Sequence, residues 1–111
     1  MRSYLIQEIN NQDMPRILEK IKQEAFESPV EGLFWLALPG HLLSSEQSSH
    51  SADCGPHYMA LETGPDWIKL ELLIRCKQKI RCDCICYALP EQREHMINFL
   101  DQLIRNQDVR V

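Results

Sequence analysis

Potential metal ligands concentrate in one serine-rich stretch, residues 39–57. The spacing His50-x3-Cys54-x2-His57 places a thiol between two imidazoles, and His41 precedes them in the same stretch. Imidazole nitrogen and thiolate sulfur are the ligands that zinc prefers in proteins. The pattern therefore predicts a metal site with His41 as the fourth ligand and zinc as the expected ion.

The same stretch allows other interpretations. Asp53 offers a carboxylate as fourth ligand, and Cys54 with His50 or His57 would make a nucleophilic pair, although no oxyanion-stabilising loop is recognisable. Polar loops also collect histidines without binding a ligand. A stretch longer than the usual connection is typical of functional loops and of disordered segments.

Three of the five cysteines alternate along the chain as Cys82, Cys84 and Cys86. On a strand, alternate residues lie about 6.6 Å apart, whereas the sulfur atoms of a tetrahedral zinc site lie about 3.8 Å apart. This spacing disfavours a metal site on a strand. We expect the three side chains to point into the core beneath the C-terminal helix, as small apolar groups.

The register of that strand follows from its neighbour, whose core face carries four alternating aliphatic residues: Ile68, Leu70, Leu72 and Ile74. With a turn over residues 77–81, Ile74 faces Cys84 and Leu73 faces Ile85. A shift by one residue would bury charged side chains, which is costly.

On the opposite face, this register gathers an apolar patch: Trp67, Leu73, Ile85 and Tyr87. Exposed patches of this kind mark surfaces for a partner or a second copy of the chain. We expect the patch and residues 39–57 to form the contact region, with homodimerisation as the simplest form. Packing of residues 39–57 over the patch is the alternative.

Four cations surround the tip of the same hairpin: Arg75, Lys77, Lys79 and Arg81. Such a cluster can bind the phosphates of a nucleotide or nucleic acid. The net charge of −4 disfavours nucleic acid as a general partner. Lysines at a hairpin also protect sheet edges from aggregation, and a solvated tip is the simpler interpretation.

The remaining pattern predicts a single α+β domain over residues 1–111, in the order β-α-β-β-β-β-α. We expect a mostly antiparallel sheet with the helices packed on one face. The expected strands are residues 2–9, 33–38, 58–62, 67–75 and 82–87, and the expected helices are residues 14–25 and 89–106.

Composition and missing motifs narrow the function. The longest apolar run, residues 33–39, is strand-sized, so we expect no membrane partner. Without a signal-peptide pattern, and with an odd number of cysteines, the chain is expected in the cytoplasm with reduced thiols. No nucleotide-binding, serine-hydrolase or metalloprotease motif is present. The leading hypothesis is a protein-interaction or ligand-binding module without catalytic activity; metal binding and anion binding are the alternatives.

Overall fold

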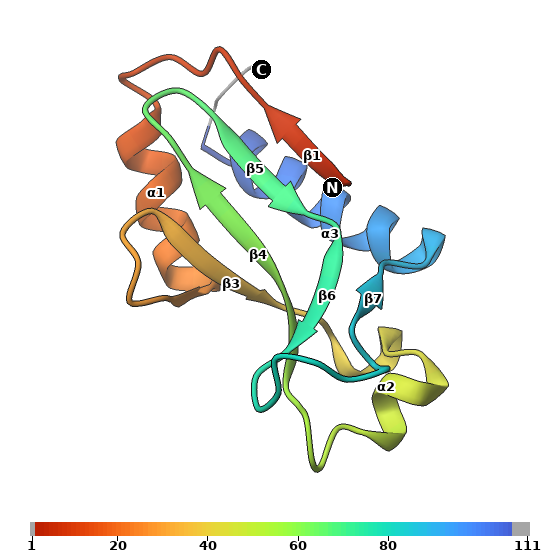
Figure 1. Ribbon diagram of the computed structural model, residues 1–111. Helices are drawn as coiled ribbons and strands as arrows, with labels where there is room; N and C mark the ends of the chain where they lie inside the picture. Colours follow the sequence, from red (N-terminus) through yellow and green to blue (C-terminus); the bar gives the residue numbers. More distant parts are fainter. Residues whose placement is uncertain (1, 108–111) are drawn as a thin grey trace.

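The computed structural model describes residues 2–107, which form a sheet with two helices behind it (Figure 1). The strands in these residues are β1 (Ser3–Ile6), β2 (Phe26–Glu27), β3 (Leu33–Ala37), β4 (His57–Thr63), β5 (Ile68–Glu71), β6 (Leu73–Cys76) and β7 (Cys86–Tyr87). The helices are α1 (Met14–Glu24), α2 (Ser45–Ser49), α3 (Pro90–Arg105) and a 3-10 turn, η1 (Gly40–Leu42). The predicted α+β class is confirmed.

The sheet is built around β4. Its strand order is β1-β5-β4-β3-β2, while β6 pairs with β4 and with β7. Each of these pairings is antiparallel, as the sequence predicted for most of the sheet. The short strand β2 was not expected; it directly follows α1 and pairs Phe26 with Trp35.

The strand predicted over residues 67–75 is broken at Leu72. Its backbone N–H donates to the carbonyl of Arg2 at 3.0 Å, and its carbonyl accepts from Ala88 at 2.8 Å. Both β5 and β6 pair with β4. Between these two pairings, the strand contains two more residues than the matching part of β4. An insertion of this kind bends a strand. Here it directs β6 toward β7 and the cysteine-rich segment.

α1 and α3 cover one face of the sheet, as expected (Figure 1). Helical spacing places Ile17 and Ile21 of α1, with Leu100 and Ile104 of α3, in the fully buried core. The sheet contributes Phe34, Leu36, Met59, Leu61, Ile68 and Leu70. Within residues 2–107, the helices lack the length and apolarity needed to cross a bilayer.

The last hairpin has a different register from the predicted one. Ile74 faces Cys86, and Leu73 faces Tyr87. Each partner on the second strand lies two residues further along than the sequence indicated. The predicted register is therefore wrong by two residues, which is one full repeat of strand alternation.

The segment that precedes β7 is a turn and not a strand. The N–H of Ile85 donates to the carbonyl of Cys82 at 3.0 Å, which closes the turn before β7 begins. Strand alternation therefore does not apply to residues 82–85. Cys84 is buried, but Cys82 is half-buried and Cys86 is exposed. The prediction that all three point into the core is wrong.

The serine-rich segment contains η1 and α2, and α2 begins at a capping box. The Ser44 hydroxyl accepts from the N–H of Gln47 at 3.2 Å, and the Gln47 side-chain oxygen accepts from the N–H of Ser44 at 3.0 Å. This reciprocal pair fixes the start of a helix. α2 lies beyond the end of the sheet, near β7 (Figure 1), and so brings residues 50–54 close to the cysteine turn.

A tyrosine on β1 connects the edge of the sheet to α3. The Tyr4 hydroxyl donates to Asp101 Oδ1 at 2.7 Å. We expect Tyr4→Phe to lower the free energy of unfolding by about 1 kcal/mol at pH 7, measured by urea denaturation.

The same bond gives this prediction a pH dependence. The hydrogen bond to Asp101, with partial burial, raises the pKa of Tyr4 from 10.0 to about 12. A raised pKa of the folded state means that the contribution is complete below pH 10 and is lost as the pH approaches 12. The two proteins should therefore become equally sensitive to urea at high pH; a constant difference would contradict the assignment.

Candidate metal centre

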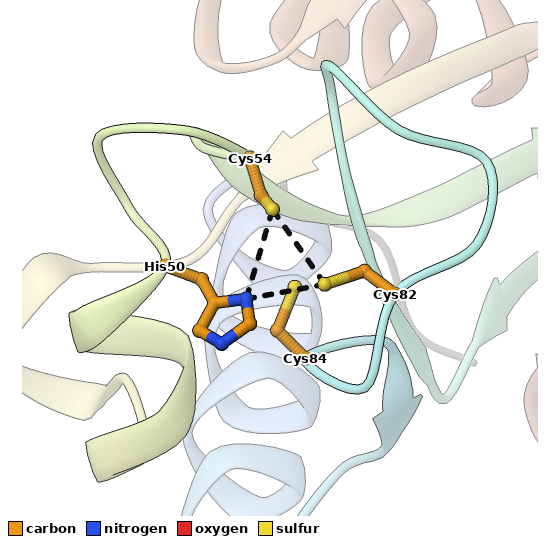
Figure 2. A group of neighbouring side chains, drawn as sticks. All are labelled: His50, Cys54, Cys82 and Cys84. Carbon is orange, nitrogen blue, oxygen red and sulfur yellow. Dashed lines mark hydrogen bonds between the residues drawn. The ribbon is translucent and has the colours of Figure 1, made fainter.

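Four side chains from two separate segments converge near one end of the sheet: His50, Cys54, Cys82 and Cys84 (Figure 2). His50 caps the end of α2, and Cys54 follows in the next turn. The other two cysteines come from the turn before β7. Figure 2 shows their sulfur atoms and the imidazole ring directed toward a common centre.

The distances among these groups are close to those of a metal site. His50 Nδ1 lies 3.1 Å from Cys82 Sγ and 3.8 Å from Cys54 Sγ, and these two sulfurs are 3.6 Å apart. One ligand atom from each of the four residues lies within 4.8 Å of all the others. Tetrahedral zinc, with bonds of about 2.3 Å to sulfur and about 2.0 Å to nitrogen, separates its ligand atoms by roughly 3.5–3.8 Å. Two of the three distances lie close to this spacing, the distance between His50 Nδ1 and Cys82 Sγ is shorter, and Cys84 lies within 4.8 Å of the other ligand atoms.

Local backbone geometry forms each ligand pair. The N–H of Cys54 donates to the carbonyl of His50 at 2.7 Å, so about one helical turn separates the two side chains and they face the same way. The turn that closes on the Cys82 carbonyl places Cys84 beside it. Within each segment, the local backbone therefore brings two candidate ligands together without contacts from the other segment.

The thiols differ in how readily they ionise. Burial is the main cause that raises the pKa of Cys54 and of Cys84 above the usual range. The backbone N–H of Cys84 donates to the Cys82 sulfur and is the main cause that lowers the pKa of Cys82 to about 7. The Cys82 thiolate is therefore the first of the three to become available to a cation as the pH rises.

Two buried glutamines brace the cysteine turn. Gln47 Nε2 donates to the carbonyl of Cys84 at 3.3 Å, and Gln47 Oε1 accepts from Gln92 Nε2 at 2.9 Å. Gln92 Nε2 also donates to the carbonyl of Leu42 at 2.8 Å, and Gln92 Oε1 accepts from the N–H of Leu89 at 2.9 Å. The network connects α3 through α2 to a candidate ligand, and such outer-shell bonds orient the groups that hold a metal.

No protein-family model, curated protein or solved structure matches this chain. No activity, ligand or partner is therefore transferred from a relative. The chemistry that the site can support is therefore inferred from its own side chains alone.

Two of the four ligands predicted from the sequence belong to the group, and two lie outside it. His57 on β4 is buried, and neither of its ring nitrogens has a hydrogen-bond partner among the described residues. Burial, with a smaller effect of His50, lowers its pKa, which keeps it neutral. His41 stands edge-on to His95 of α3, with 6.2 Å between ring centroids.

Cys82 and Cys84 are the two members of the group that were not predicted as metal ligands from the sequence. They form a second close pair that complements His50-x3-Cys54. Structural zinc sites usually combine two ligand pairs from separated segments, although a cysteine pair more often has two to four intervening residues. The alternation of these cysteines predicts a strand, on which the two sulfurs would lie too far apart.

The residues predicted as an interaction patch lie at three places. Trp67 lies at the turn between β4 and β5, at the far end of β5 from the others. Leu73 and Tyr87 face each other across β6 and β7, and the Arg2 guanidinium lies 4.9 Å from the Tyr87 ring centroid. Ile85 packs against the buried cysteines. The shifted register thus separates Ile85 from Leu73.

The predicted anion-binding cations divide between two surfaces. Arg75, Lys77 and Lys79 line a groove on the open face of the sheet, and Arg75 Nε also donates to Glu71 at 2.8 Å. Arg81 lines an adjoining hollow beside the cysteine turn, which shares Ile80 and Ile85 with the groove. Three of the four cations therefore share one site.

Proposed function

We propose that this chain is a zinc-binding protein, with His50 Nδ1 and the sulfurs of Cys54, Cys82 and Cys84 as ligands. The observation that supports this function is the convergence of the four ligand atoms within 4.8 Å of one another. Three thiolates with one imidazole form a ligand set that structural zinc sites use repeatedly. Soft sulfur ligands also disfavour magnesium and calcium, which prefer oxygen.

The zinc has a structural role in this proposal. Four protein ligands complete a tetrahedral shell, whereas a catalytic zinc keeps one position for water or substrate. Cys54 and Cys84 are also almost fully buried, so substrate would have no access from their side. The proposal therefore describes a stabilising site and not a hydrolytic enzyme.

The position of the site explains why a metal is useful there. The main core lies between the sheet and the helices α1 and α3, whereas Cys54, Cys76 and Cys84 form a separate small cluster. So few apolar atoms contribute little burial free energy. Zinc would bond the turn after α2 to the turn before β7. Burial raises the pKa of Cys54, and the charge of nearby Lys79 opposes this rise in part and would offset thiolate charge.

We also place the protein in the cytoplasm. All five cysteines are free thiols, and three of them would be zinc ligands. Reducing compartments keep thiols in the form that binds zinc.

Metal analysis of the chain purified without an affinity tag tests the proposal. We expect close to one equivalent of zinc per chain, and cobalt substitution should give the intense visible absorption of a tetrahedral thiolate site. Less than about a tenth of an equivalent, with no uptake of added zinc or cobalt under reducing conditions, would contradict it.

Zinc binding should release protons. At pH 8 the Cys82 thiol, with a pKa of about 7, is mostly ionised, whereas the raised pKa values of Cys54 and Cys84 keep those thiols protonated. We expect release of about two protons per zinc at pH 8, and more as the pH falls below 7. Calorimetric titration in buffers of different ionisation enthalpy measures this number. No release at pH 8 would exclude Cys54 and Cys84 as ligands.

A further inference from the structure

A groove of about 560 Å³ crosses the face of the sheet that α1 and α3 leave open. Its floor is the aromatic pair Trp35 and Tyr58, whose ring centroids lie 5.5 Å apart. Phe26 is the cross-strand neighbour of Trp35 on one side, and Arg75 is the cross-strand neighbour of Tyr58 on the other. The groove therefore runs between the short edge strand β2 and the hairpin that joins β6 to β7.

The sides of this groove present apolar groups to solvent. Ile80 on the hairpin is 90% exposed, and Phe26 on β2 is 62% exposed. Pro29 and Ile85 add further apolar surface to the lining. Large apolar side chains that remain exposed around a concave surface are typical of a site that a partner covers.

The charge of the groove is opposite to that of the chain. Arg75, Lys77 and Lys79 line it, and Glu27 is the one acidic residue among the lining groups. The segment 75–81 contains four of the 12 cationic residues of the chain and no acidic residue, although the net charge is −4. A concentration of positive charge on an acidic protein attracts carboxylates or phosphates selectively.

We propose that this groove binds an acidic peptide segment of a partner protein, with bulky apolar side chains over Trp35 and carboxylates beside Lys77 and Lys79. Single-stranded nucleic acid fits less well, because bases bind by stacking on open aromatic faces. Tyr58 is only 8% exposed and Ile80 offers no aromatic face, which leaves Phe26 as the one strongly exposed aromatic side chain in the lining. This function goes beyond zinc binding and uses different side chains.

Selection from a displayed library of random short peptides tests the proposal on the full chain. The enriched peptides should combine Asp or Glu with Leu, Ile, Phe or Trp. For selected peptides that contain no Trp, binding is read from the emission of Trp35 in the variant Trp67→Phe, which leaves Trp35 as the single tryptophan of the chain. Enrichment of basic peptides, or no enrichment, would overturn the proposal.

Two variants locate the bound peptide. K77Q/K79Q should weaken the selected peptides about tenfold, and more at low salt than at high salt. K20Q/K22Q removes the same charge from α1 and should leave the affinity unchanged. If both pairs of substitutions weakened peptide binding equally, the attraction would be a general effect of charge, and the assignment of the peptide to this groove would be overturned.

A second readout separates peptide from nucleic acid and from the zinc site. Phe26→Ala alters an exposed side chain and should weaken the peptides at least fivefold while the zinc content stays that of the wild type. A mixed-sequence single-stranded oligonucleotide should not displace the peptide. Displacement by the oligonucleotide at lower concentration than by free peptide would assign the groove to nucleic acid instead.

Discussion

Cys82→Ser is expected to remove the bound zinc and to lower the melting temperature by roughly 15 °C, because loss of a metal is among the most destabilising changes in a small domain. A serine hydroxyl stays protonated at neutral pH and cannot replace a thiolate on zinc. Cys82 is only half-buried, so the substitution leaves no large cavity and its effect reports mainly the metal. Metal analysis and thermal unfolding of the variant measure both results.

Cys86→Ser is the matched control. Cys86 lies four residues further along the same segment, is exposed and is not one of the four converging ligands. This variant should keep one equivalent of zinc and change the melting temperature by no more than about 2 °C. Loss of zinc from Cys86→Ser, or its retention in Cys82→Ser, would contradict the ligand assignment.

A reversible version of the experiment uses the wild-type chain. A chelator should lower the melting temperature toward that of Cys82→Ser, and added zinc should restore it. The chelator should have no further effect on Cys82→Ser itself. If the variant remained as sensitive to the chelator as the wild type, its ligands would have to lie elsewhere.

The parts of the fold that local patterning could predict are those in which one period persists. Helical spacing through Ile17 and Ile21, and strand alternation through Ile68 and Leu70, gave the correct elements and the correct buried faces. Leu72 also fits the alternation, yet the strand breaks there. The partners that draw its backbone away, Arg2 and Ala88, are distant in sequence, so a local pattern does not contain them.

Only part of the candidate site could be predicted, again because a local pattern does not contain contacts between segments that are distant in sequence. His50 and Cys54 are four residues apart and were recognisable from their spacing. The alternation of Cys82, Cys84 and Cys86 predicts a strand, which directs these side chains into the core and separates their sulfurs too far for a metal site. The turn that closes at Ile85 removes that restriction. Ligand spacing therefore has to be judged against both the strand and the turn that a short alternating segment can adopt.

Gln92→Leu is the second substitution with a large expected effect. Gln92 is 1% exposed, and its side chain bonds to Leu42, Leu89 and Gln47. Leucine fills a similar volume but leaves these partly or fully buried polar groups with one partner fewer each. Since an unsatisfied buried group costs about 1–3 kcal/mol, we expect a loss of roughly 3 kcal/mol in the free energy of unfolding, measured by urea denaturation.

Gln92→Leu should also lower the affinity for zinc. This second effect separates a role of Gln92 in positioning the cysteine turn from simple loss of stability. Gln92 positions Gln47, and Gln47 holds the backbone of Cys84, so zinc affinity should fall at least tenfold in a competition titration with a chromogenic chelator. Gln102→Leu on the exposed side of the same helix should alter neither the affinity nor, beyond about 0.5 kcal/mol, the stability. A destabilised Gln92→Leu with wild-type zinc affinity would show that the glutamine pair supports the helices alone. A parallel loss of both would show that two buried amides connect the metal site to α3.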